Sequence, residues 1–304
     1  MGRLLEGKVA LITGGGRGVG RGIAIAMAQA GAKVVVNDLG ASLDGKLDGE
    51  QPAHEVVARI EELGGAASVD GGSVADWNAA NRMVEVALNA FGRIDIVVNN
   101  AGILRDAMFH RMSEPEFDDV LAVHLKGSFN VSRAAAPHFK AQGSGVYVHM
   151  TSTSGLIGNF GQANYSAAKL GIVGLSKSIA LDMQRFGVRS NAVAPFAWTR
   201  MIDSIPAETP EQKKRVDGLK KLVPERVAPF VVGLCADAAS DVSGQIFGVR
   251  NNEIYLFSQP RPIRNAHRSE GWTPQSVVDT ALPMLRAGFF PLDRSSDVFT
   301  WDPV

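Results

Sequence analysis

A tyrosine and a lysine stand four residues apart at Tyr165 and Lys169, and Ser152 lies thirteen residues before the tyrosine. Residues at positions i and i+4 share one face of a helix, so the Lys169 ammonium is expected beside the Tyr165 phenol. A neighbouring positive charge lowers a phenol pKa from about 10 toward neutrality, where acid–base catalysis is efficient. The Ser152 hydroxyl is suited to bind a substrate oxygen whose charge changes. These residues predict proton transfer at an alcohol or carbonyl oxygen, although such Tyr–Lys pairs also occur on plain surface helices.

A glycine-rich segment, TGGGRGVG, runs from Thr13 to Gly20, directly after an apolar strand pattern and at the start of a helical one. Glycines let the chain turn tightly and bring backbone N–H groups close to a pyrophosphate, which the positive end of the helix attracts. Asp38 ends the next strand pattern, where a carboxylate can accept hydrogen bonds from a ribose. The alternative to a dinucleotide site is a glycine-rich turn that binds no ligand. The dinucleotide contacts predicted here are Gly14, Arg17, Gly18, Val19, Gly20 and Asp38.

The charge of Asp38 also bears on which dinucleotide is bound. A 2′-phosphate about 4 Å from this carboxylate would cost about 4 kcal/mol per unit-charge pair at an effective dielectric of about 20. Arg17 can offset part of that repulsion, because guanidinium groups bind phosphate. The residue before Asp38 is Asn37 and not a second cation. The sequence therefore favours NAD over NADP.

Short apolar runs alternate with amphipathic helical patterns along most of the chain. This alternation predicts an α/β fold of three layers, a Rossmann-like doubly wound parallel sheet, as a single domain over residues 1–257. The predicted strands are Lys8–Thr13, Lys33–Asn37, Ala67–Val69, Ile94–Val98, Gly145–Met150, Val188–Ala192 and Gln245–Phe257. The predicted helices are Val19–Ala30, Ala53–Leu63, Asp76–Phe91, Glu114–Gln142 and Asn164–Phe186.

Two segments interrupt this alternation. Residues 196–224 are polar and contain the basic cluster Lys213–Arg215, which indicates either a substrate loop that meets phosphates or a solvated surface excursion. Residues 258–304 are rich in proline, arginine and aromatic residues. They are too few for a second domain and too apolar for a free tail. We expect this C-terminal extension to pack on its own domain or on a neighbouring subunit.

The composition excludes several classes of partner. Lys and Arg number 31, as do Asp and Glu, so the net charge is zero and nothing attracts nucleic acid. No run of about 18 apolar residues is present, so no membrane span is expected. The single cysteine, Cys235, and the absence of a secretory signal pattern predict a cytoplasmic location. The histidines show no metal-ligand spacing, so no metal is expected.

The glycine motif, the Asn99–Gly102 stretch, Ser152, and Tyr165 with Lys169 together resemble the short-chain dehydrogenase/reductase family in order and spacing. The resemblance implies hydride transfer between a nicotinamide and a secondary alcohol or ketone, in a homodimer or homotetramer. It assigns Ser152 to substrate positioning, Tyr165 to proton transfer, and Lys169 to lowering the tyrosine pKa and holding the nicotinamide ribose. The further cofactor contacts that it implies are Ser73, Val74, Asn100, Ala101, Gly102, Tyr165, Lys169 and Thr199.

Two departures from the family pattern point to one branch of it. His124 stands where a catalytic asparagine is usual, and Phe196 stands where a glycine usually follows Pro195. Both features, with Asn37–Gly40 and Gly158–Tyr165, are similar to the (3R)-hydroxyacyl-CoA dehydrogenase part of peroxisomal multifunctional enzymes of type 2.

That similarity implies NAD-dependent oxidation of a 3-hydroxyacyl-CoA to a 3-oxoacyl-CoA, in the breakdown of lipids or steroids. A hydroxysteroid dehydrogenase or carbonyl reductase that does not use CoA esters is the alternative, and a non-catalytic NAD-binding sensor is a remote one. Two roles are open for His124. It can be a catalytic residue that holds a water of a proton relay, or a structural residue that braces its helix.

Overall fold

The computed structural model describes residues 3–41, 51–197, 209, 216–217 and 220–301. Its centre is an eight-stranded sheet in the order β3-β2-β1-β4-β5-β6-β7-β8, in which β8 alone is antiparallel to its neighbour. The strands are β1 (Val9–Thr13), β2 (Lys33–Asn37), β3 (Ala67–Asp70), β4 (Ile96–Asn99), β5 (Gly145–Met150), β6 (Val188–Phe196), β7 (Ile246–Arg250) and β8 (Glu253–Leu256). The predicted doubly wound parallel sheet is confirmed.

The strand order explains where a ligand can bind. β1 pairs with β2 on one side and with β4 on the other, so the order of the chain reverses at β1. A crevice opens at such a reversal, at the carboxyl ends of the strands. The central strands are continuous apolar runs because helices cover both faces of the sheet.

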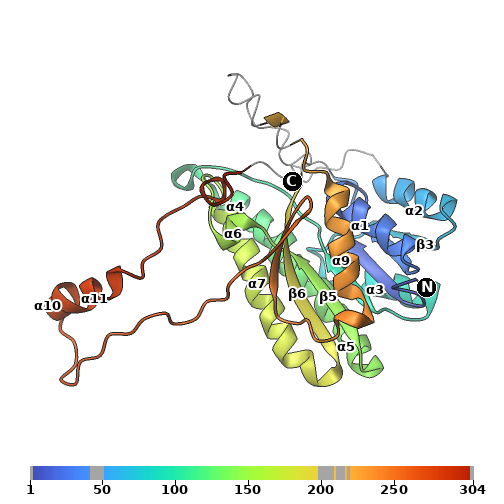
Figure 1. Ribbon diagram of the computed structural model, residues 1–304. Coiled ribbons are helices and arrows are strands. Elements are labelled where there is room, and N and C mark those ends of the chain that lie inside the picture. The colour runs from blue at the N-terminus through green and yellow to red at the C-terminus, as the bar shows by residue number, and fades with distance from the viewer. Residues whose placement is uncertain (1–2, 42–50, 198–208, 210–215, 218–219, 302–304) are drawn as a thin grey trace.

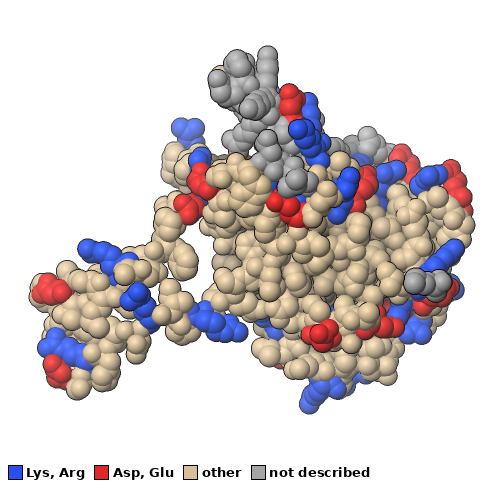
Figure 2. Space-filling model, viewed as in Figure 1, with Lys and Arg blue, Asp and Glu red and all other residues tan. Residues whose placement is uncertain are grey.

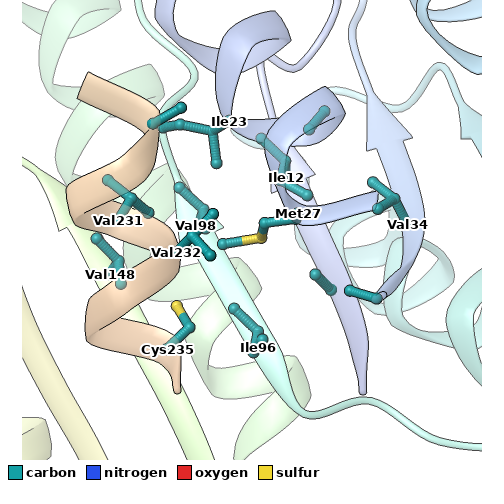
Figure 3. Packing of buried hydrophobic residues seen from close by; sticks show 14 of the residues in the cluster. Ile12, Ile23, Met27, Val34, Ile96, Val98, Val148, Val231, Val232 and Cys235 are labelled. Atoms are coloured by element: carbon teal, nitrogen blue, oxygen red, sulfur yellow. The ribbon is translucent and has the colours of Figure 1, made fainter. Parts of the chain in front are cut away.

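One face of the sheet is covered by α1 (Gly18–Gln29), α2 (Pro52–Glu62) and α9 (Ala228–Cys235). Figure 3 shows Val231 and Val232 of α9 beside Ile96, Val98 and other apolar side chains of this cluster. Cys235 lies in the same cluster as a buried free thiol, so its sulfur acts here as a small apolar group.

The other face is covered by α3 (Trp77–Phe91), α5 (Gly127–Gln142) and α7 (Ala163–Met183). The predicted helix Glu114–Gln142 is interrupted, because α4 (Glu114–Leu121) passes through a π-helical turn, η2 (Ala122–Lys126), into α5. The short α6 (Thr153–Leu156) follows β5. The 3₁₀ turns are η1 (Phe109–Arg111), η3 (Gln184–Phe186), η4 (Pro224–Val227) and η5 (Asp237–Ala239).

The prediction of one strand over Gln245–Phe257 is wrong. The segment forms a hairpin of β7 and β8, because the chain turns at residues 251–252, where Asn251 adopts a left-handed φ of 57°. Asparagine tolerates this conformation better than most residues. The antiparallel β8 covers the edge of β7 that would otherwise be open to pairing.

After β8 the chain leaves the body as a projecting arm, residues 258–293 (Figure 1). The arm carries α10 (Pro274–Ser276), the π turn η6 (Val277–Ala281) and α11 (Leu282–Arg286), and the chain then returns to the body at α12 (Ser295–Val298). The Ser295 N–H donates to the Gly158 carbonyl at 2.9 Å. The Phe299 ring packs edge-on against Phe196 with centroids 4.7 Å apart. The C-terminal segment 294–301 is therefore docked on the body, whereas the arm is bonded to it near its base, where the Gln259 amide donates to the Gly244 carbonyl.

On the face of the molecule drawn in Figure 2, neither acidic nor basic side chains form a large patch of their own. Figure 2 shows acidic and basic side chains interspersed around a broad uncharged area. Among the described residues, none of the helices has the length and apolar character needed to cross a bilayer.

Candidate active site

The turn after β1 needs glycine at several positions. A Cβ on Gly14 would stand 2.8 Å from the Ala101 Cα, and one on Gly20 would collide with the Gly14 carbonyl oxygen. Gly14 and Gly18 also have φ angles of 60° and 52°, which other residues rarely adopt. The turn therefore presents bare backbone at the N-terminus of α1, whose first turn contains no acidic residue. This cradle fits the pyrophosphate of a dinucleotide.

Asp38 follows β2 and faces the glycine turn. Its Oδ2 accepts a hydrogen bond from the Gly16 N–H at 2.9 Å, and its Oδ1 accepts one from the Gly40 N–H at 2.9 Å. Each carboxylate oxygen retains a further lone pair, so ribose hydroxyls can still bind there. The Arg17 guanidinium donates to the Ala41 carbonyl at 3.1 Å. This hydrogen bond holds the cation against the segment that follows Asp38.

Thr13, which the sequence motif does not mark as functional, joins the turn to the end of β4. Its Oγ1 accepts hydrogen bonds from the N–H groups of Asn100 at 3.0 Å and Ala101 at 3.1 Å. The Asn100 side chain donates in return to the carbonyls of Thr13 at 3.1 Å and Gly14 at 2.9 Å. The structure thus brings Asn100, Ala101 and the glycine turn together, with the Asn100 amide used as a brace.

Ser73 and Val74 lie after β3 at the same edge of the sheet. The Val74 side chain is buried against Gly127 of α5, and its carbonyl accepts a hydrogen bond from the Asn130 amide at 2.9 Å. The Ser73 hydroxyl accepts a hydrogen bond from the Ala75 N–H at 3.3 Å. Asn130 is a second positioning side chain that the sequence did not reveal, because its partners are distant backbone carbonyls.

Tyr165 and Lys169 come together as predicted from their spacing, and Ser152 is hydrogen-bonded to Tyr165. Tyr165 and Lys169 lie one turn apart on α7, with the Lys169 Nζ 5.4 Å from the centre of the tyrosine ring. Nζ donates to the Met150 carbonyl at 2.7 Å, which fixes the ammonium at the end of β5. Ser152 caps α6, where its Oγ accepts a hydrogen bond from the Ser154 N–H at 3.1 Å.

The acid–base properties of this group differ from the expectation. Burial raises the pKa of Tyr165 to about 12, and a hydrogen bond with Ser152 only partly offsets this. Burial also lowers the pKa of Lys169 to about 7. Burial of the phenol therefore opposes the lowering that the Lys169 charge was expected to produce. Desolvation dominates at both groups, and the ammonium is bonded to the Met150 carbonyl rather than to the phenol.

His124 lies in the π turn η2 with its side chain fully buried. Its Nε2 is 3.1 Å from the Ile103 nitrogen and 2.8 Å from the Ile103 oxygen, and its ring stands edge-on to Tyr165 with centroids 5.2 Å apart. Nδ1 is buried and has no hydrogen-bond partner among the described residues. Burial lowers the pKa of His124 to about 3, so the imidazole is neutral at ordinary pH.

Some predicted residues cannot be placed. Thr199 and the basic cluster Lys213–Arg215 lie outside the described residues. Within the part of the chain that the structure describes, no three His, Cys, Asp or Glu side chains gather as metal ligands would.

Comparison with known proteins agrees with this geometry. Residues 8–208 match the short chain dehydrogenase family. The chain is 48% identical over 238 residues to a Mycobacterium tuberculosis protein named as a short-chain type dehydrogenase/reductase, Rv0148, covering 78% of this chain and 80% of that one. A crystal structure of a short chain dehydrogenase from Mycobacterium avium superimposes with a TM-score of 0.82 at 38% identity, covering 95% of this chain and 98% of that one.

Two further relatives carry more specific names. The hydroxyacyl-CoA dehydrogenase ChsB1 of Mycobacterium tuberculosis is 37% identical over 286 residues, covering 91% of this chain and 88% of that one. The peroxisomal multifunctional enzyme type 2 of Mus musculus is 42% identical over 276 residues, covering 90% of this chain but only 36% of the longer mouse protein. The chain belongs to the short-chain dehydrogenase family and is an oxidoreductase that acts on a CH–OH group with a nicotinamide cofactor.

Proposed function

We propose that this enzyme oxidises a 3-hydroxyacyl-CoA to the corresponding 3-oxoacyl-CoA with NAD. The observation that carries the chemistry is the grouping of Ser152, Tyr165 and Lys169 at the carboxyl end of β5. The substrate class is supported by the similarity to ChsB1 and to the mouse multifunctional enzyme, each across about nine-tenths of this chain.

In this proposal, Ser152 binds the substrate oxygen and Tyr165 accepts the alcohol proton at its phenolic oxygen. Lys169, held by the Met150 carbonyl, stabilises the phenolate by its charge and binds the nicotinamide ribose. NAD supplies the hydride acceptor when it is bound. The residues that would hold NAD are Gly14, Arg17, Gly18, Val19, Gly20, Asp38, Ser73, Val74, Asn100, Ala101, Gly102, Tyr165 and Lys169, together with Thr199 from the sequence resemblance.

The preference for NAD over NADP rests on Asp38. Its carboxylate is fixed by the N–H groups of Gly16 and Gly40, so it cannot swing away from a 2′-phosphate without breaking both hydrogen bonds. The repulsion therefore persists in the complex. The nearby Arg17 already donates to Ala41, which reduces what it can offer to a phosphate.

For His124, the geometry favours the bracing interpretation over the proton relay. Nε2 is held by the Ile103 backbone, so this nitrogen is not available to a relay water. His124 would thus hold the 101–103 backbone against α7 as a positioning residue.

We propose that the arm packs on a second copy of the chain, in a homodimer or homotetramer. Phe290 is 85% exposed and Leu292 fully exposed, although a monomer gains nothing from presenting such side chains together. The body offers a hollow of about 490 Å³, whose lining includes the apolar side chains of Met108, Phe109, Phe160 and Leu170. Residues 1–257 would then form the catalytic domain and 258–304 an extension used for assembly. A cytoplasmic location stays a prediction, which fractionation of cells would test.

The substrate is tested by following NADH formation with (3R)- and (3S)-hydroxybutanoyl-CoA, the free hydroxy acid and a simple hydroxysteroid. Turnover confined to a CoA ester is the expected result. Turnover of the free alcohols alone would overturn the acyl-CoA assignment and indicate a hydroxysteroid dehydrogenase or carbonyl reductase.

A further inference from the structure

The C-terminal segment 294–301 touches the body at two places. At the first, the Ser295 N–H and hydroxyl both donate to the Gly158 carbonyl, at 2.9 Å and 3.2 Å. In Figure 1, the red helix α12 accordingly lies beside the loop that follows α6. At the second, four residues later, the Phe299 ring packs on Phe196. The segment therefore connects the loop after α6 with the end of β6.

The catalytic Ser152 is close to both of these docking points. The Gly158 N–H donates to the Thr153 carbonyl at 3.2 Å, so the first point lies within about one helical turn of Ser152. The Thr151 N–H donates to the Val193 carbonyl at 2.8 Å, which keeps the end of β5 level with the last residues of β6. A substrate held by Ser152 is therefore near the C-terminal segment.

The Phe196 side chain points to the face of the sheet that α7 covers. Successive side chains of a strand point to opposite faces. Ala192 packs with Val173 of α7, whereas Val193 belongs to the apolar cluster under α1 and α9. Phe196 lies four residues after Ala192 on the same strand and so shares its face. Phe299, which packs on Phe196, is thus on the side of the sheet where α7 carries Tyr165.

Phe299 is the centre of a group of aromatic rings. Its centroid lies 4.7–6.4 Å from those of four other rings. We call the five residues Phe196, Tyr255, Phe257, Phe299 and Trp301 the aromatic wall. None of the five is buried, so they retain accessible apolar surface beside the catalytic group.

The aromatic wall is held in place by charged groups at the end of the segment. The Trp301 indole N–H donates to the Glu253 carboxylate at 2.7 Å, and the Arg250 guanidinium donates to the Trp301 carbonyl. Arg250 also pairs with Glu253 at 3.0 Å and lies 5.4 Å from the centre of the Trp301 ring. Because Ser295 and Trp301 are both bonded to the body, the position of Phe299 between them is fixed from either side.

We propose that Phe299 is a specificity-determining residue that contacts the acyl chain of the substrate, so that the enzyme favours long-chain over short-chain 3-hydroxyacyl-CoA. An aromatic surface has no group that could bind the phosphates of CoA, whereas each methylene group moved from water onto it strengthens binding. The inference rests on the proposed oxidation of a 3-hydroxyacyl-CoA and adds a selection of chain length to it.

The test compares wild type with Phe299→Ala, Phe299→Leu and the control Phe230→Ala. Phe230 packs edge-on against Phe247 with centroids 5.0 Å apart, on the opposite face of the sheet. The readout is the ratio of kcat/KM for 3-hydroxydecanoyl-CoA to kcat/KM for 3-hydroxybutanoyl-CoA, both with NAD. We expect this ratio to fall about tenfold in Phe299→Ala, as the lost burial of about two methylene groups would give. Phe299→Leu should keep most of the ratio, and Phe230→Ala should leave it unchanged.

A ratio that stays the same or rises in Phe299→Ala overturns the inference, even if both kcat/KM values fall, because a merely structural role affects the two substrates alike. An equal fall of the ratio in Phe230→Ala also overturns it, since the effect would then come from lost stability. Failure of the proposed function has a different signature, in which wild type turns over neither CoA ester. The ratio is then measured on a long and a short member of the alcohols that wild type does convert, with the same expected and overturning results.

Discussion

The imidazole of His124 occupies the space that a side chain at position 102 would need. A Cβ on Gly102 would collide with the His124 Cε1 and stand 3.0 Å from both ring nitrogens. The nearest groups are those of a rigid ring that is itself held by the Ile103 backbone. The glycine at 102 is therefore matched to the histidine at 124, and the pair sets how closely the strand-end loop approaches the π turn.

This pairing predicts that Gly102→Ala lowers the free energy of unfolding by about 1–3 kcal/mol, as overpacking does. In a His124→Ala background the same substitution should cost much less, because the colliding ring is gone. Urea unfolding of the two single variants and the double variant measures this difference, since His124→Ala alone also loses the contacts of the ring. Gly174→Ala is a suitable control, since a Cβ there meets nothing within 4 Å in a helix interior. An equal cost of Gly102→Ala in the wild-type and His124→Ala backgrounds would contradict the pairing.

Tyr165→Phe should lower kcat at least about 100-fold, because the variant loses the group that accepts the alcohol proton, while NADH still binds with at most the loss of one hydrogen bond. Steady-state kinetics and NADH binding measure the two quantities. Activity close to that of wild type would exclude Tyr165 as the proton acceptor. Loss of NADH binding would instead indicate damage to the fold. A non-catalytic NAD-binding protein would show no effect beyond binding.

The buried Lys169 should make stability rise with pH. Its pKa is lowered from 10.5 to about 7 in the folded chain, so between these values the unfolded chain binds more protons than the folded one. Stability then increases as pH rises through this window, and the cost of the buried ammonium is fully present below pH 7. Lys169→Met should flatten this part of the curve of unfolding free energy against pH. Lys140→Met, at an exposed lysine, should not. An unchanged slope in Lys169→Met would show that Lys169 is not the group responsible.

Asp38→Asn should raise the affinity for NADPH at least about tenfold relative to NADH, since the variant removes the charge that repels a 2′-phosphate. The substitution keeps an oxygen that can still accept the Gly16 N–H. Fluorescence titration with both cofactors provides the comparison. If wild type already binds NADPH more tightly, the proposed role of Asp38 in selecting NAD is wrong.

Phe290→Asp with Leu292→Asp should shift the chain from an oligomer to a monomer, because two charges would enter the proposed contact with a second copy. Size exclusion with light scattering measures the mass. Arg268→Asp is the control on the same arm, at a side chain that pairs with the neighbouring Glu270. A monomeric wild type would refute the proposed assembly.

The fold was predictable where the local pattern and the long-range contacts agree. The strands Lys33–Asn37 and Gly145–Met150 have the predicted bounds, since parallel strands covered on both faces are rich in valine and other apolar residues. The π turn was not predictable, because a single extra residue in a helix leaves the apolar period almost unchanged. The hairpin was missed because both of its strands are short and apolar.

Within the candidate site, spacing was enough for residues on one element, such as Tyr165 and Lys169 on α7. It was not enough for Thr13 or Asn130, whose partners lie far along the chain and come close only in the folded protein. The pKa of Tyr165 was also beyond the sequence, because desolvation depends on what surrounds the ring. The path of residues 258–301 could not be predicted either, because it depends on contacts with residues far away in the sequence.

The arm leaves the body after β8 and comes back at Arg294, so the segment 294–301 is tied to the enzyme twice, by the covalent chain and by its docking contacts. The covalent tie keeps the local concentration of this segment near its docking site high. A protease that cuts the exposed arm once would remove that advantage without removing any contact. The aromatic contacts of Phe299 and the hydrogen bond to Gly158 would then have to hold a separate peptide, which dilution alone can release. The length and exposure of the arm thus make the C-terminal segment a part whose retention depends on an unbroken chain.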